Sequence, residues 1–195
     1  RALATINIAI NQGSAAFKRI SEVIDKDIQI TNQENLPKLN IAKSNIKFEN
    51  VQFKYLSTKS KALHDVNLKI QGGSMTAFVG HSGAGKSTII NLLPRFYDPL
   101  DGRILIDGQN IKEVTLQSLR GNISLVSQDV ILFDGTIKKN ISYADETSSD
   151  DDIVKACKFA AAHEFISQMP EGYNTLIGEN GVKLSGGQKQ RISIA

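Results

Sequence analysis

The residues whose spacing most clearly suggests chemistry are GHSGAGKST at positions 80–88, which fit the pattern G-x-x-x-x-G-K-[ST]. Glycines at Gly80 and Gly85 let the backbone curl until successive N–H groups point at phosphate oxygens. Lys86 is placed to reach the β- and γ-phosphates, and the Ser87 hydroxyl to ligate Mg²⁺. A short apolar segment precedes the loop and a helical pattern follows it, so we predict a nucleotide-binding loop.

The whole loop belongs to the predicted nucleotide-binding set. Thr88 is expected to add a phosphate contact. His81 occupies a variable position, and we interpret it as a spacer or a water-exposed contact rather than as a base. The predicted loop residues are Gly80, His81, Ser82, Gly83, Ala84, Gly85, Lys86, Ser87 and Thr88.

A second phosphate-seeking feature lies about a hundred residues further on. Ser185 followed by Gln188 has the form of a capping box, which places Gly186 and Gly187 in the first turn of a helix. Backbone N–H groups there have no partner within the helix, and the missing side chains let a large anion approach closely. The two surfaces could grip one nucleotide within a chain, or one of them could serve a partner chain.

Length and composition set only broad limits. The 195 residues suit one domain, or one domain with an appendage, and the formal charge of +3 is too weak to indicate nucleic-acid binding. The single cysteine, Cys157, excludes an internal disulfide, and we expect it to be a small buried residue rather than a nucleophile. The sequence shows neither a signal peptide nor an apolar run of membrane-spanning length.

The first segment has a helical pattern. Two interpretations are open: a helix packed on its own domain, or one that continues upstream. Residues 25–43 are polar, contain Pro37 and are predicted to be a linker. The apolar stripe comprises Ile6, Ile10, Gly13, Phe17, Ile20 and Ile24.

The elements that must position the loop begin with strands. Residues 46–55 alternate with a slip at Glu49 and Asn50, which predicts two strand pieces joined by a turn or bulge. Residues 66–70 alternate again, and Gly72 and Gly73 mark a turn. We predict an antiparallel sheet ahead of the main core.

The main core is predicted from shorter apolar segments. Residues 76–79 and 122–127 (NISLVS) are expected to be strands, the second of them ending at Gln128. The helix after the loop must end or kink at Pro94, and Asp-Gly pairs bracket the strand RILID at 103–107.

A later helix is predicted to start at Ser149, because three aspartates follow it and suit a positive helix N-terminus. We favour this helix-start role for the aspartates over a metal site. The expected buried stripe of this helix is Ile153, Cys157, Ala160, Ala161 and Phe165.

Taken together, the two phosphate motifs resemble the ATP-binding domain of ABC transporters, with LSGGQ at 184–188 as the family signature and GHSGAGKST as its phosphate loop. The resemblance covers residues 46–195 and implies ATP and Mg²⁺ as ligands. It implies that Tyr55 stacks on adenine and that Gln128 touches Mg²⁺ and water. The implied catalytic residues are Lys86, Gln128, Ser185 and Gly187, the implied metal ligands Ser87 and Gln128, and the signature contacts Leu184, Ser185, Gly186, Gly187 and Gln188.

Further segments are similar to exporters whose membrane and ATPase halves are fused. LFDGTIKKNI at 132–141 looks like the segment that meets the coupling helices, and 177–188, with Glu179, looks like the cross-talk loop. FKRISEVIDKD at 17–27 is similar to the cytoplasmic tail of the last membrane helix, which favours the upstream continuation. The implied domains are a tail at 1–27, a linker at 28–43 and an ATP-binding domain at 44–195.

The family pattern also leads us to expect a fragment cut at both ends. A magnesium aspartate, a catalytic glutamate and a switch histidine should follow the signature, and His64, His81 and His163 all precede it. The isolated chain is therefore expected not to turn over ATP. Since the family places strands between 76–79 and 122–127, those two are expected not to pair directly.

The expected fold class is α/β: a P-loop nucleotide hydrolase core with an N-terminal antiparallel β subdomain and a helical subdomain, incomplete at the C-terminus. The implied function is ATP-driven export of a hydrophobic or lipid substrate at the cytoplasmic face of the inner membrane. Expected partners are a second ATP-binding domain arranged head to tail, the membrane domain of the same chain and the membrane, with no nucleic acid. Alternatives are a soluble ABC-type clamp of DNA repair or chromosome cohesion, and a nucleotide-binding module without turnover. Tyr55, the tail and the lack of a heptad run argue against the clamp.

Overall fold

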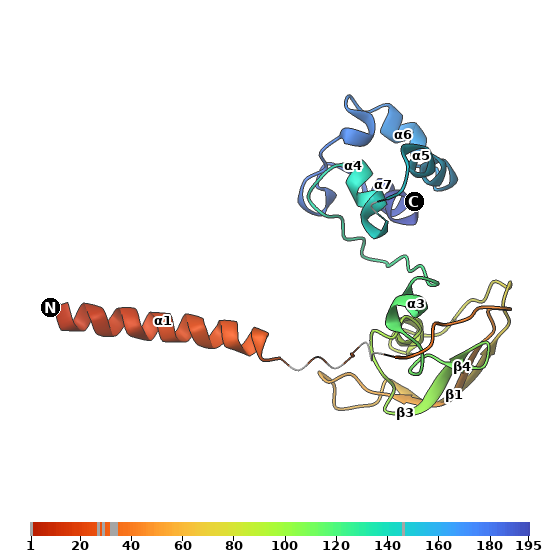
Figure 1. Ribbon diagram of the computed structural model, residues 1–195, viewed down its shortest axis with the longest axis horizontal. Helices are drawn as coiled ribbons and strands as arrows, with labels where there is room; N and C mark the ends of the chain where they lie inside the picture. Colours follow the sequence, from red (N-terminus) through yellow and green to blue (C-terminus); the bar gives the residue numbers. More distant parts are fainter. Residues whose placement is uncertain (1, 27, 29, 32–34, 146) are drawn as a thin grey trace. The chain divides into compact units, whose positions relative to one another are not determined.

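The computed structural model describes residues 2–26, 28, 30–31, 35–145 and 147–195 (Figure 1). The chain forms two compact units, Arg1–Ile123 and Ser124–Ala195. The first unit contains α1 (Ala2–Ile24), β1 (Ile46–Phe53), β2 (Leu63–Ile70), α2 (Lys86–Leu92), β3 (Asp101–Ile106), β4 (Gln109–Asn110) and α3 (Leu116–Arg120). The second contains α4 (Ile137–Ile141), η1 (Ser142–Ala144), α5 (Asp150–Phe159), α6 (His163–Ser167), η2 (Gly172–Asn174), η3 (Glu179–Gly181) and α7 (Gly186–Ile194).

The sheet of the first unit is antiparallel, in the order β2-β1-β3-β4, which confirms the predicted β subdomain. In β1 the register with β2 shifts between Phe48 and Val51, where Asn50 has a φ of +49°. This irregularity confirms the bulge predicted from the slip at Glu49 and Asn50, because an extra residue restores apolar side chains to the buried face.

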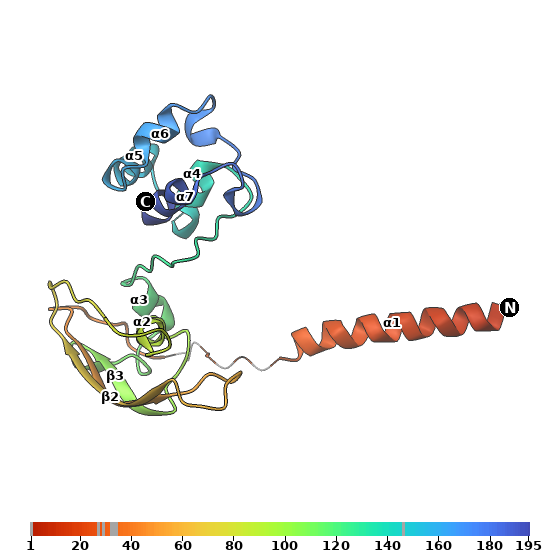
Figure 2. The ribbon, with the colours of Figure 1, turned by 180° about the vertical axis from the view of Figure 1, so that it is seen from behind.

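Two helices cover one face of this sheet. Leu92 of α2 and Leu119 of α3 are fully buried in one cluster with Phe48 and Ile104 of the strands. Both views of the ribbon show α2 and α3 within the curve of the sheet (Figures 1 and 2). Burying such a side chain contributes roughly 1.5–3 kcal/mol, so this contact fixes the helix that follows the phosphate loop.

The second half of the predicted linker has a fixed place on the sheet, and we call residues 39–45 the strap. The side chain of Leu39 is buried in the sheet's core, and its N–H donates to the Ser118 hydroxyl at 2.9 Å. The Asp107 carboxylate accepts the backbone N–H groups of residues 42–45 at 2.8–2.9 Å. These bonds, that from Lys43 foremost, lower the pKa of Asp107 to about 2.

The prediction of two strands in the main core is wrong. Residues 76–79 and 122–127 form no ladder with any described residue, and no pairing joins one to the other. A strand exists only where a neighbour satisfies its backbone N–H and C=O groups. Val79 is 89% exposed, which fits an apolar segment without such a neighbour.

The predicted N-terminal helix is confirmed as α1. The described side chains of its apolar stripe are exposed, among them Phe17 at 70% and Ile24 at 74%. Within the part of the chain that the structure describes, none of the helices combines the length and apolarity needed to cross a bilayer.

The second unit is helical, as predicted. Ser149 caps α5 by accepting the N–H of Asp152, which confirms the helix-start role of the aspartates. Cys157 is fully buried, and burial raises the pKa of its thiol, as expected of a packing residue. The predicted burial of Ala161 is wrong, because α5 ends at Phe159 and Ala161 turns away with a φ of +53°, leaving Ala162 to fill the core.

Candidate nucleotide-binding site

The phosphate loop takes its shape from glycines that no other residue could replace without strain. Gly83 and Gly85 have φ values of +80° and +87°, in the left-handed region. Gly85 also lies against the sheet: a Cβ there would be 2.6 Å from Leu63 Cδ2 and 2.9 Å from the Ala62 carbonyl oxygen. The loop is therefore fixed against β2 where α2 begins.

Lys86, the first residue of α2, folds back over this loop. Its ammonium donates to the carbonyl oxygens of Gly80 at 2.9 Å and His81 at 2.8 Å. The His81 ring is exposed and hydrogen-bonded to the Ser82 carbonyl oxygen, 2.8 Å away. The ammonium thus lies at the mouth of the loop, where a phosphate could replace the two carbonyl partners.

The structure brings Tyr55 and the loop together, although 33 residues separate Tyr55 from Thr88. The Tyr55 hydroxyl is hydrogen-bonded to Thr88 Oγ1 at 3.1 Å, and Thr88 is only 5% exposed. The Thr88 hydroxyl, predicted to contact phosphate, is thus engaged by Tyr55. The predicted adenine residue and the predicted phosphate residue form one connected site.

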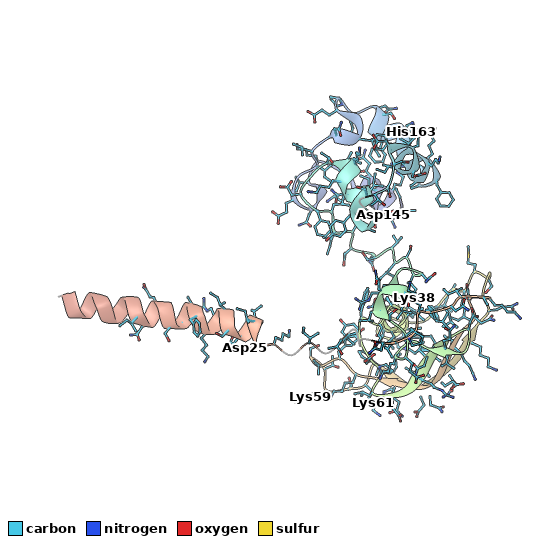
Figure 3. The ribbon with its side chains drawn as sticks, viewed as in Figure 1. Asp25, Lys38, Lys59, Lys61, Asp145 and His163 are labelled. Atoms are coloured by element: carbon cyan, nitrogen blue, oxygen red, sulfur yellow. The ribbon has the colours of Figure 1, made fainter. Side chains whose placement is uncertain are left out.

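An aromatic cluster surrounds Tyr55. Its ring packs edge-to-face against Phe53 at 4.7 Å and against Tyr97 at 5.2 Å between centroids. A cavity of about 340 Å³ opens beside these three rings. Lys59 and Lys61 lie on the β1–β2 connection that follows Tyr55 (Figure 3).

The signature helix start has the predicted geometry. The Ser185 hydroxyl accepts the Gln188 N–H at 3.3 Å, and Gln188 Oε1 accepts the Ser185 N–H at 2.9 Å, so the capping box is confirmed. A Cβ built at Gly186 or Gly187 would meet nothing within 4 Å. Internal packing therefore does not require these two glycines.

Gln128 lies near this helix start. With Asp129 and Val130 it lines a hollow of about 230 Å³ whose other wall is Gly186, Lys189 and Gln190. The structure thus brings together two of the predicted contacts, Gln128 and Gly186, within the second unit. The phosphate loop and Tyr55 belong to the first unit.

The two exporter-like segments also meet. Thr136 forms a bridge with Leu176, and the Ile177 N–H donates to the Gly135 carbonyl at 3.1 Å. Glu179 is exposed in η3, and the Asn180 N–H donates to the Leu132 carbonyl at 3.2 Å. The segment at 132–141 and the loop carrying Glu179 therefore form one surface.

Residues 63–195 match the protein family described as "ABC transporter". The chain belongs to the ABC transporter family. It is 50% identical over 176 residues to a protein of Staphylococcus aureus strain NCTC 8325 / PS 47 that is provisionally named a multidrug export ATP-binding/permease protein. A protein of the same description from the bovine strain RF122 / ET3-1 is 49% identical. Each alignment covers 90% of this chain and 30% of the relative.

A solved structure, described as a bacterial Atm1-family ABC exporter with ATP bound, matches with a TM-score of 0.86 and 44% identity. The match covers 98% of this ABC transporter chain and 33% of the exporter. The α/β fold class and the resemblance to fused exporters are therefore confirmed. The chain spans about a third of the length of these relatives.

The two predicted Mg²⁺ ligands belong to different units, Ser87 to the first and Gln128 to the second. Ser87 and Gln128, the two predicted ligands, are both exposed and offer a hydroxyl and an amide oxygen. Mg²⁺ prefers such hard oxygen donors and is usually held by one or two protein groups together with phosphates and water.

Sequence reasoning missed Tyr97, which packs on Tyr55 from the turn after α2. The segment RFYD at 95–98 carried no periodic signal, and an aromatic side chain in a turn has no fixed role. The available signal was the run of aromatic and charged residues directly after the phosphate helix, which by itself gave Tyr97 no partner.

Proposed function

We propose that the intact protein binds MgATP and hydrolyses it to drive export of a hydrophobic or lipid substrate across a membrane. The observation that carries this proposal is the connected site around the phosphate loop. Left-handed glycines shape the loop, Lys86 lies at its mouth, and Tyr55 joins it through Thr88. The multidrug-export names of the relatives support the transport step.

In this proposal each ATP is held by two copies of the domain arranged head to tail. One copy supplies the phosphate loop and the other the start of α7. The open space at Gly186 and Gly187 supports this arrangement, because glycines that no internal contact requires are available to a partner's phosphate. A partner copy, identical or homologous, is thus part of the site.

Within this site the chain's own residues have separate tasks. Lys86 neutralises phosphate charge, Tyr55 offers a ring face to adenine, and Ser185 fixes the start of α7. Ser87 and Gln128 would hold Mg²⁺, which supplies further neutralisation of phosphate charge when bound.

The proposal places the domain at the cytoplasmic face of a membrane, joined through α1 to a membrane domain of the same chain. The surface formed by residues 132–141 and the Glu179 loop would bind the coupling helices of that domain, which transmit movement to the membrane part. Phe133 of this surface is exposed and available for such a contact, and its ring stacks at 4.3 Å on that of Tyr143 in η1.

The test uses the full-length protein in inverted membrane vesicles, with a fluorescent hydrophobic cation and a fluorescent phospholipid as alternative cargoes. ATP-dependent movement of either cargo, lost in Lys86→Ala and retained in the exposed-lysine control Lys158→Ala, is the expected result. Phosphate release that is equal in Lys86→Ala and wild type would reject the site. Recovery of the full-length protein entirely in the soluble fraction would favour the clamp alternative.

A further inference from the structure

The cavity beside Tyr55 has two tyrosine walls. It measures about 340 Å³, and its lining includes Phe53, Tyr55, Leu56, Tyr97, Asp98 and Leu100. Pockets for small ligands fall in the range of about 300–1,000 Å³ and are lined mainly by apolar and aromatic side chains. A flat aromatic ligand group is the chemistry that such a lining favours.

Tyr97 fixes the orientation of Tyr55 within this cavity. The two rings are 5.2 Å apart at 87°, and Tyr97 also packs on Phe53 at 5.4 Å and 53°. Tyr55 is therefore held between Phe53 and Tyr97, with its hydroxyl on Thr88. Removal of Tyr97 would free one side of the Tyr55 ring while leaving the other contacts in place.

The turn that carries Tyr97 is unusually well held. Arg95 is only 6% exposed, and its guanidinium forms a bidentate salt bridge with the Asp98 carboxylate, with Nε–Oδ1 and Nη2–Oδ2 distances of 2.8 and 3.1 Å. Arg120 of α3 donates to the carbonyl oxygens of Pro94 and Arg95, both at 3.0 Å, and its guanidinium lies 5.6 Å from the Phe96 ring centre. Arg120 thus holds the backbone just before Tyr97, and the side-chain pair Arg95–Asp98 spans Tyr97.

We propose that Tyr97 is a base-positioning residue of the nucleotide site: it holds the Tyr55 ring and closes the wall of the cavity that receives adenine. The inference rests on the proposed binding of ATP. The same turn follows directly from α2, so one short segment links the base cavity to the phosphate loop. Tyr55 touches this segment at both ends, at Thr88 and at Tyr97.

The test measures binding to the full-length protein of three probes: MgATP, adenosine and inorganic tripolyphosphate. Tyr97→Leu removes the ring and keeps apolar bulk, whereas Tyr97→Phe keeps the ring. Phe159→Leu, which removes an exposed aromatic ring from α5 in the other unit, is the matched control.

Tyr97→Leu should weaken adenosine and MgATP about two- to tenfold, the range expected for loss of one aromatic contact, and leave tripolyphosphate within about twofold. Tyr97→Phe and Phe159→Leu should bind all three probes as the wild type does. Unchanged adenosine binding by Tyr97→Leu would overturn the inference. An equal weakening of tripolyphosphate binding would also overturn it, because it would show that Tyr97 only stabilises the structure of the turn. A wild-type protein that binds no MgATP would refute the proposed function itself.

Discussion

Replacement of Gly187 by alanine should leave α7 as stable as before, or more stable, and yet abolish ATP turnover by the full-length protein. The reason is that Gly187 lies in the first turn of α7, where a Cβ would meet nothing within 4 Å. Glycine at this position lowers the stability of the helix, but it leaves room for the phosphate of the partner's ATP. An alanine methyl group would occupy that room.

The expected size of the stability effect follows from the same geometry. Alanine is favoured over glycine inside a helix by roughly 0.5–1 kcal/mol, and no contact at Gly187 opposes it. Local unfolding of α7 should therefore become up to about 1 kcal/mol less favourable. ATP binding to each phosphate loop should persist, since the loop belongs to the other unit.

Gly181 provides the matched control in the same unit. Its φ is +61°, and a Cβ there would lie 2.9 Å from Leu132 Cδ1. A left-handed alanine costs about 1–2 kcal/mol before any clash is counted. Gly181→Ala should therefore loosen the α7 region, the opposite of Gly187→Ala.

Amide hydrogen exchange of α7 and steady-state phosphate release, both on the full-length protein, are the two measurements. Slower or unchanged exchange together with lost phosphate release is expected for Gly187→Ala. Phosphate release within about twofold of wild type would show that no anion approaches this helix start closely, and faster exchange would show that Gly187 serves the fold.

Other predictions test the nucleotide site and the strap. In titration calorimetry, Lys86→Ala should weaken ATP strongly and adenosine little, whereas Tyr55→Ala should weaken both; identical profiles would contradict the separate roles. Tyr55→Phe should keep adenosine binding but speed hydrogen exchange at the start of α2, because it leaves the buried Thr88 hydroxyl without its partner at a cost of about 1–3 kcal/mol. The folded pKa of Asp107, lowered to about 2 from 3.8, means that its hold on residues 42–45 is complete above about pH 4 and is lost as pH falls toward 2. Exchange at residues 42–45 should rise in that window, corrected for intrinsic rates, and Asp107→Asn should raise it at neutral pH.

Local chemistry made the loop and the caps predictable. Glycines at fixed spacing before Lys86, and Ser185 three residues before Gln188, specify backbone shapes within a single turn, and the structure has both. The bulge at Asn50 was predictable for the same reason, since alternation is a property of adjacent residues. The predicted burial of Ala161 was wrong because the end of a helix depends on the φ of a single residue, and hydrophobic periodicity carries no information about that angle.

The strands at 76–79 and 122–127 failed for a different reason. An apolar segment predicts that a strand will form where neighbours are present, but the neighbours themselves are long-range partners. Neither segment finds one among the described residues. The strap shows the converse, because a polar stretch gained its fixed place from the distant carboxylate of Asp107.

The candidate nucleotide site also has one part that local sequence predicts and one part that depends on long-range contacts. Its phosphate side is contained in the consecutive residues 80–88, so a motif reveals it. Its base side needs Tyr55 from the end of β1 and Tyr97 from the turn after α2, and the bulged sheet and two arginines bring these rings within 5.2 Å. Nothing local requires that meeting, because each tyrosine alone could equally be a surface residue. A contact that depends on two separate turns and on a sheet register can be recognised only once the chain is folded, and this is why Tyr97 was missed while Lys86 was not.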